Sequence, residues 1–157
     1  TMFFSTSNGY TEDSQVVFSE DIPYLKSVAS KWDESISSSF NYEAEMSLDD
    51  FYKKLDLNYD KNLSIVLLDR SSSGRIISLK INGKLFTGRE LYNKLKIRST
   101  DFAIIQEGEK VKIKTKGFGH GVGMSQYGAF GMAKNGYKYN EILAHYYKGT
   151  NLKKLAN

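Results

Sequence analysis

Hydrophobic and polar residues alternate most regularly in residues 110–116 (KVKIKTK), where valine, isoleucine and threonine separate the lysines. This period of two is typical of a strand with one buried face. Residues 102–106 (FAIIQ) form a second β-prone run, and Glu107-Gly108 between the two runs suits a turn. The pattern therefore predicts a β-hairpin over residues 102–116.

A second group of strands is predicted upstream of this hairpin. Residues 63–68 (LSIVLL) and 75–81 (RIISLKI) are β-prone runs joined by the turn-rich SSSG segment. Asn82-Gly83 is a hairpin signal that leads into a further strand at residues 84–86.

Short helices are predicted where capping residues precede apolar residues at helical spacing. Ser47 with Asp50 resembles a capping box, and the apolar residues that follow it are Leu48, Phe51, Tyr52 and Leu55. Thr87 with Glu90 forms a second box and predicts a helix near residues 88–95.

Two helices are predicted at the C-terminal end. Ser125 can cap a helix that continues to about Lys134, and Asn140 can cap a last helix through Tyr147. Residues 1–40 show weak periodicity, which favours loops and short strands, with Phe3-Phe4 as part of one strand. The whole pattern predicts an α+β fold with a mainly antiparallel sheet and short helices.

Composition limits the size of the fold and the kinds of site that the chain can form. A chain of 157 residues with 40% hydrophobic and 25% charged residues suits one soluble domain over residues 1–157. No apolar run reaches the length of about 18 residues that a membrane span needs, and no signal peptide is visible. The absence of cysteine excludes disulfides, zinc–thiolate sites and thiol nucleophiles.

Charge is distributed unevenly along the chain. Residues 1–60 contain 12 Asp/Glu and 4 Lys/Arg, whereas residues 61–157 contain 6 and 18. The basic part could meet nucleic acid, anionic lipid or an acidic wall polymer. Alternatively, the acidic and basic parts face each other within the molecule.

The strongest candidate for function is a glycine-rich stretch. Seven of the thirteen glycines lie in residues 117–136 (GFGHGVGMSQYGAFGMAKNG), together with His120, one of two histidines. Glycine at this density lets a backbone turn tightly and approach a ligand closely. A structural alternative is that the His120 ring fixes the loop by bonding a backbone carbonyl.

This motif, with IRSTDF at residues 97–102 and SSSGR at residues 71–75, resembles the stage II sporulation protein D family of lytic transglycosylases and the related amidase-enhancer domains. Further segments share the resemblance, so it runs nearly end to end: FFSTSNGYTEDS at residues 3–14, IPYLKSVASKWD at residues 22–33 and ILAHYYKGT at residues 142–150.

The resemblance implies an extracytoplasmic enzyme, membrane-anchored in the full-length protein on the outer face of the mother-cell membrane. Such enzymes cleave peptidoglycan between N-acetylmuramic acid and N-acetylglucosamine and leave 1,6-anhydromuramic ends, here during engulfment of a forespore. A carboxylic acid protonates the glycosidic oxygen and the C6 hydroxyl of the sugar attacks C1, so one carboxyl residue can act as acid and then as base.

The family's catalytic glutamate belongs to an upstream helical segment that nothing in residues 1–157 resembles. We therefore assign no catalytic acid here. This chain is expected to be the C-terminal portion of a longer catalytic domain and to be inactive alone. Glu12 and Asp101 are the local alternatives, in a polar loop and in the IRSTDF motif.

The resemblance also implies substrate-binding residues. Tyr24 and Lys26, two apart in an extended segment, would present a hydroxyl and an ammonium on the same side; an exposed edge strand is the alternative. The other candidates are Ser7, Asn8 and Thr11 in a polar loop, where plain turn chemistry is the alternative, with His120 and Gln126 in the glycine-rich stretch.

Other residues receive more ordinary interpretations. Ser125 is expected to cap a helix, because no Ser-His-Asp arrangement accompanies it. Phe118 and Tyr127, beside the glycine-rich stretch, are candidates for ligand contact. His145 is expected to be structural, and the two histidines and the missing cysteines give no metal site, so no cofactor is predicted.

Three functions remain open at this point. A lytic transglycosylase, represented here by a fragment, leads, with glycan strands, a wall amidase and a membrane anchor protein as partners implied by the resemblance. The second is a noncatalytic glycan-binding or amidase-enhancer module. The third is a nucleic-acid-binding domain, which no binding signature supports, so no nucleic acid is predicted as a partner.

Overall fold

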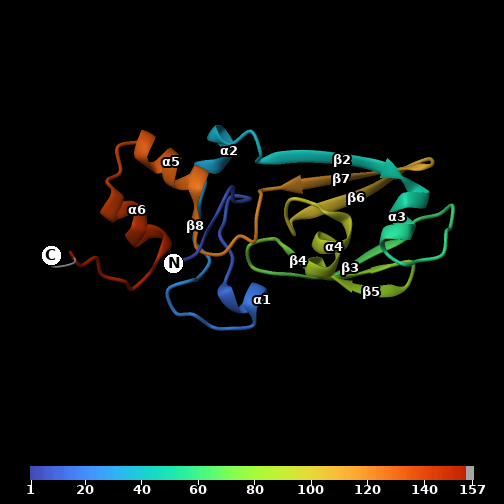
Figure 1. The fold of residues 1–157 in the computed structure, drawn as a ribbon, viewed down its shortest axis with the longest axis horizontal. Coiled ribbons are helices and arrows are strands. Elements are labelled where there is room, and N and C mark those ends of the chain that lie inside the picture. The colour runs from blue at the N-terminus through green and yellow to red at the C-terminus, as the bar shows by residue number, and fades with distance from the viewer. Residues whose placement is uncertain (155–157) are drawn as a thin grey trace.

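Residues 41–116 form one of two lobes in the computed structural model, which describes residues 1–154. We call it the middle lobe. Residues 1–40 and 117–154 make up the second, terminal lobe, and the two lie side by side along the long axis of the molecule (Figure 1). The chain crosses between them at two neighbouring points, where the Gly117 amide donates a hydrogen bond to the Phe40 carbonyl over 2.8 Å.

The middle lobe contains two antiparallel sheets of three strands, in the orders β2-β7-β6 and β3-β4-β5. Its elements are β2 (Asn41–Ser47), α3 (Leu48–Lys54), β3 (Ile65–Arg70), β4 (Ile76–Ile81), β5 (Lys84–Thr87), α4 (Gly88–Leu95), β6 (Phe102–Glu107) and β7 (Lys110–Lys116). Within β7, Val111, Ile113 and Thr115 are buried while Lys110, Lys114 and Lys116 are exposed, as the alternation predicts.

Both sheets and both helices of this lobe share one hydrophobic core. It includes Phe51 of α3, Leu55 directly after α3, Leu91 of α4, Ile81 of β4 and Ile113 of β7, each almost fully buried. Removing such side chains from water is the main stabilising contribution to a lobe of this size.

The terminal lobe has a separate core and is mostly helix and loop. Its elements are β1 (Phe3–Phe4), α1 (Ser14–Phe18), α2 (Asp33–Ile36), β8 (Met124–Ser125), α5 (Gln126–Lys134) and α6 (Tyr139–Tyr146). β1 pairs with β8 in parallel. Leu25, Val122, Met132 and Tyr146 are central to its core, so the start and the end of the chain pack together.

The α+β class with mainly antiparallel sheets is confirmed, as are both hairpins and the helices that follow Ser47, Thr87 and Ser125. Other details differ. The last helix begins after Lys138 and not after Asn140, because Glu141 bonds back to the Lys138 amide. The prediction of one domain over residues 1–157 stays a prediction.

The acidic and basic parts of the chain do form ion pairs with each other, at the surface of the middle lobe. Lys110 pairs with Glu45 at 2.8 Å, and Lys94 pairs with Asp56 at 2.7 Å. Each pair joins the basic residues 61–157 to the acidic residues 1–60, so part of the charge asymmetry is neutralised within the middle lobe. In the part of the chain that the structure describes, no helix is long and apolar enough to cross a membrane.

Thr87→Ala should lower the free energy of unfolding by about 1 kcal/mol, because Thr87 caps α4 in both directions of a capping box. Its hydroxyl accepts from the Glu90 amide at 3.0 Å, and the Glu90 carboxylate accepts from the Thr87 amide at 2.7 Å. Urea unfolding measures the loss. Lys84→Ala, at an exposed position of β5, is the control and should change stability by less than about 0.5 kcal/mol.

Candidate functional site

Residues 117–124 are here called the glycine loop. In space, the loop packs between the first residues of the chain on one side and Glu12 on the other. The Phe118 amide donates to the Thr6 carbonyl at 2.7 Å, and the Glu12 amide donates to the Gly121 carbonyl at 2.7 Å. A Cβ at Gly123 would lie 2.1 Å from the Met2 carbonyl oxygen, and the φ of Gly123 is +84°. The loop thus needs glycine for close backbone packing as well as for its turns.

His120 lies at the surface of this loop, between the rings of Phe4 and Phe18, with both ring centroids 5.7 Å away. Its Nδ1 accepts a hydrogen bond from the Val122 amide at 3.0 Å, which leaves the ring proton on Nε2. His120 therefore bonds the loop backbone through an amide and not, as the structural alternative had it, through a carbonyl, and it also lines a pocket.

Burial lowers the pKa of the His120 imidazole below its usual value near 6.5. The Phe3 backbone opposes this lowering of the pKa because it favours the protonated ring, and the positive charges of Arg89 and Arg75 add to the lowering. The ring is accordingly neutral at pH 7. Its Nε2–H can donate a hydrogen bond, whereas Nδ1 is already bonded to the Val122 amide, and the ring does not supply a permanent charge.

This lowered pKa predicts a pH-dependent stability. Below about pH 6.5 the unfolded chain binds a proton that the folded His120 resists, so the stability falls as the pH drops. His120→Asn should remove this part of the loss, which urea unfolding between pH 5 and pH 7.5 would measure. His145→Asn leaves His120 in place, so this variant should still lose stability as the pH drops. An unchanged slope in His120→Asn would refute the assignment.

A pocket of about 230 Å³ lies beside His120, and we call it the arginine pocket. Arg75 and Arg89 supply its positive charge, and Glu12 its carboxylate. Its other lining residues are Val16, Val17, Ile76, Ile77, Thr87, Tyr92, Thr100, Gly119 and His120. The pocket thus joins the glycine loop to the middle lobe.

Glu12 is fully buried, and three donors already bond its carboxylate. These are the Asp13 amide at 2.9 Å, the Ser73 hydroxyl at 2.7 Å and the Ser71 hydroxyl. The serines belong to the SSSGR segment of the middle lobe. Glu12 therefore joins the two lobes, and it is not free to protonate a substrate oxygen in this structure.

Asp101, the other local carboxylate, is also held by a hydrogen bond and an ion pair. Its carboxylate accepts a hydrogen bond from the Asn8 side-chain amide at 2.8 Å and forms an ion pair with Arg70 at 3.4 Å. The same Asn8 group also donates to the Ser73 carbonyl at 2.8 Å. The three motifs that carry the family resemblance, IRSTDF, SSSGR and the glycine loop, therefore meet around the polar loop of residues 7–12.

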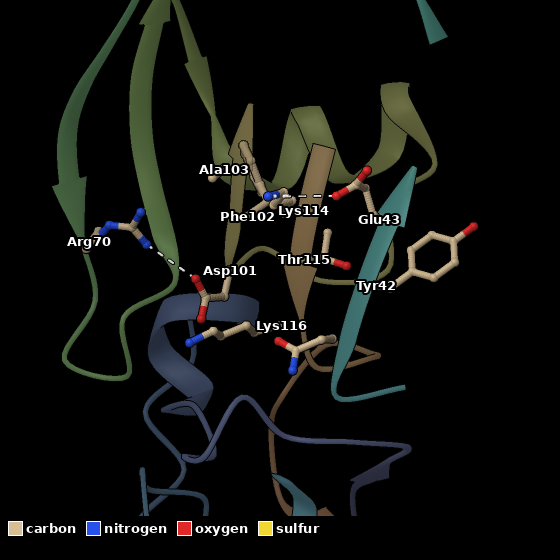
Figure 2. A pocket seen from close by; sticks show the side chains of 10 residues that line it. Tyr42, Glu43, Arg70, Asp101, Phe102, Ala103, Lys114, Thr115 and Lys116 are labelled. Carbon is tan, nitrogen blue, oxygen red and sulfur yellow. Dashed lines mark hydrogen bonds and ion pairs between the residues drawn. The ribbon is translucent and has the colours of Figure 1, made fainter. Parts of the chain in front are cut away.

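A larger pocket, about 530 Å³, opens next to Asp101 on the face of the β2-β7-β6 sheet. Figure 2 shows Arg70 and Asp101 facing each other at one side, and the Lys114–Glu43 pair, 3.8 Å apart, at the other. Lys116 also lines the pocket. Most of its charges are thus paired with one another.

The remaining predicted residues are spread more widely. Ser7 and Thr11 are fully buried, and their hydroxyls donate to the Ser30 and Lys26 carbonyls at 3.2 and 3.3 Å. Both therefore hold the loop in place. Tyr24 is 38% exposed, and the ammonium of Lys26 is paired with Asp21.

Gln126 lies apart from this group, on α5, where it lines a separate pocket of about 220 Å³ with Tyr127 and Phe130. Phe118 is exposed, with the Arg98 guanidinium 5.1 Å from its ring centroid. His145 bonds the Ala29 carbonyl at 2.7 Å and contacts the Trp32 ring, a structural position as expected. The described residues contain no cluster of three or more His, Asp or Glu that could hold a metal.

Two groups at this site were not singled out from the sequence. Arg75 is part of the quoted SSSGR segment, but only the fold shows that its guanidinium packs under Gly121, where a Cβ would lie 2.8 Å away. Asp33 is fully buried and accepts from the Ser7 amide at 2.9 Å and from the Ser30 hydroxyl at 2.6 Å. The sequence does not indicate the contact of Arg75 with Gly121 or the bond of Asp33 to Ser7, since these residues are distant along the chain.

The fold and the site thus define an α+β module whose two lobes meet at a glycine–histidine loop. No family model matches the chain. Over 151 residues it is 40% identical to stage II sporulation protein D of Bacillus subtilis (strain 168) and 42% identical to the protein of that name from Bacillus amyloliquefaciens. Each match covers 96% of this chain and 44% of the relative, so the chain spans less than half the length of these proteins.

A shorter match links the chain to the amidase enhancer of Bacillus subtilis (strain 168), with 47% identity over 55 residues, or 35% of this chain and 8% of that protein. The chain is therefore homologous to stage II sporulation protein D nearly end to end, and similar in part to an amidase enhancer. Both similarities agree with the resemblance to sporulation protein D and amidase-enhancer domains that the sequence motifs indicate.

Proposed function

We propose that this chain acts on the peptidoglycan cell wall during sporulation, as part of a lytic transglycosylase that cleaves glycan strands to 1,6-anhydromuramic ends. The observation that carries the proposal is the homology to stage II sporulation protein D over 96% of the chain. It is supported by the position of the glycine–histidine loop beside a pocket with two arginines.

The general acid is proposed to lie in the part of the relatives that this chain does not match. Glu12 is buried among three donors, and Asp101 is bonded by Asn8 and Arg70, so neither local carboxylate is available as it stands. This chain would then supply substrate binding and not proton transfer.

Within that function, the residues divide into two kinds. Tyr24, Lys26, His120 and Gln126 have side chains that are exposed or lie at a pocket, and they are proposed to contact the glycan. Asn8 is proposed to act through the polar loop, because its side-chain amide already donates to Ser73 and Asp101. Ser7 and Thr11 are proposed to act through the loop that they hold, because their hydroxyls bond backbone carbonyls. Glycan strands, a wall amidase and a membrane anchor protein are the proposed partners, at an extracytoplasmic site.

A second candidate is a noncatalytic glycan-binding module that assists an amidase. The similarity to the amidase enhancer favours it. A binding module needs no general acid, so it is compatible with the hydrogen-bonded carboxylates of Glu12 and Asp101.

Mass spectrometry of purified, peptide-free glycan strands separates the two candidates. The strands are incubated with this chain and, separately, with its longest available parent. Anhydromuramic products from the parent alone support the transglycosylase with an acid outside this chain. Glycan binding without products from either favours the module. Products from this chain would overturn the assignment of the acid, and Glu12→Gln and Asp101→Asn would then locate it.

A further inference from the structure

The arginine pocket contains a buried cation, Arg75, whose hydrogen-bonding capacity is only partly used. Arg75 is 3% exposed and lines this pocket. Its Nη1 donates to the Ser73 hydroxyl at 2.8 Å and its Nη2 to the Tyr10 carbonyl at 3.1 Å, while Nε has no partner within residues 1–154. A guanidinium has five N–H donors, and a buried charge is normally hydrogen-bonded or paired.

Glu12 offsets only part of this charge. Its carboxylate is bonded by one amide and two serine hydroxyls, and Ser73 stands between it and Arg75. The described residues include no direct ion pair between the two groups. Arg75 therefore lies at the pocket with a positive charge that a ligand could still bind.

A second cation stands at the same pocket. Arg89, in the first turn of α4, is exposed and takes part in no ion pair within the described chain. Arg89, Arg75 and His120 line the same pocket, so both arginines lie near that ring. Arginine is well suited to a carboxylate, because its planar fork can bond both oxygens.

The other walls of the pocket are largely apolar. Val16, Val17, Ile77 and Tyr92 surround the charged groups, and Val16 is 46% exposed. A small anion alone would leave these side chains without a partner. A carboxylate that carries a short alkyl group would satisfy both parts of the pocket.

We propose that the arginine pocket binds a carboxylate whose neighbouring carbon carries a methyl group, with Arg75 and Arg89 bonding the carboxylate. This inference rests on the proposed cell-wall function. In peptidoglycan, that chemistry occurs in the lactyl group of N-acetylmuramic acid when no peptide is attached, and at a C-terminal alanine of a stem peptide. The pocket would thus read the chemical state of the muramic acid branch and not the sugar rings.

Isothermal titration of this chain with matched ligands tests the pocket. The probes are peptide-free glycan strands, the same strands with their lactyl carboxyls converted to amides, and chitin oligosaccharides, which have no carboxylate. A stem peptide ending in D-alanine and its C-terminal amide form the second pair. Arg89→Gln removes the exposed arginine, and Lys80→Gln removes an exposed charge from β4 as the control.

The free carboxylate of one pair should bind about tenfold more tightly than its amide, and Arg89→Gln should abolish that difference. The pair that shows the effect identifies the source of the carboxylate. Lys80→Gln should bind like the unaltered chain. Equal binding of acid and amide in both pairs, or an Arg89→Gln variant with unchanged preference, would overturn the proposal.

These outcomes are distinct from a failure of the proposed function. If chitin oligosaccharides and both forms of the glycan bind equally, the chain binds glycan but the pocket does not read a carboxylate. If no glycan binds, the glycan-directed function fails, and an Arg89-dependent preference for the acid form of the peptide would still support the pocket.

Discussion

Asp33→Ala should lower the free energy of unfolding by about 3 kcal/mol, because the change leaves several buried donors without an acceptor. The Asp33 carboxylate is fully buried and accepts from the Ser7 amide and from the hydroxyls of Ser30 and Ser125. These three residues come from the N-terminal segment, the loop before α2 and the end of β8, where Ser125 caps α5. Urea unfolding followed by circular dichroism measures the loss.

Two variants sharpen this prediction. Asp33→Asn keeps one oxygen acceptor in nearly the same volume, so it should cost clearly less than Asp33→Ala. Glu34→Ala, at the neighbouring exposed position, should change stability by less than about 0.5 kcal/mol. If Asp33→Ala were as mild as Glu34→Ala, the carboxylate would not organise the terminal lobe.

Gly128→Ala should destabilise the protein by about 3 kcal/mol, although alanine favours a helix over glycine by roughly 1 kcal/mol. Gly128 lies in α5, and a Cβ there would be 2.1 Å from the Tyr146 hydroxyl and 2.3 Å from the Ser30 hydroxyl. Those two groups bond each other at 2.6 Å. The methyl group would therefore separate the partners of a buried network.

The control for this change lies in the same helix. Ala133→Gly, at an exposed position of α5, should cost only about 1 kcal/mol, from helix propensity alone. Thermal unfolding of both variants, monitored at the same wavelength, gives the comparison. A Gly128→Ala variant that is more stable than the unaltered chain would show that α5 does not pack against Tyr146 as described.

The sequence predicted the parts of the fold that local chemistry determines. Thr87 and Glu90 form the capping box, and Asn82-Gly83 forms the turn of its hairpin, because their bonds join residues that are close along the chain. β2 was not predicted. Its residues NYEAEMS are mostly exposed, and the strand forms because the backbone pairs with β7.

At the site, too, local features could be predicted from the sequence and contacts between distant residues could not. The glycine loop and His120 could be found from composition, since glycine is concentrated there. The contacts of Glu12 with Ser73 and of Asp33 with Ser125 join residues 61 and 92 positions apart, and no spacing in the sequence indicates them. For the same reason the sequence could not show that Ser7 and Thr11 are buried, or that Arg75 lines a pocket.

The most direct test of a glycan-directed function is an NMR titration of the isotope-labelled chain with peptide-free glycan strands. We predict shifts concentrated in the glycine loop, residues 117–124, around Arg89 and at Tyr24, Lys26 and Gln126, with much smaller shifts on the outer lysines of β7. Shifts confined to those lysines and lost at modest salt would contradict it, because they would indicate binding through charge alone.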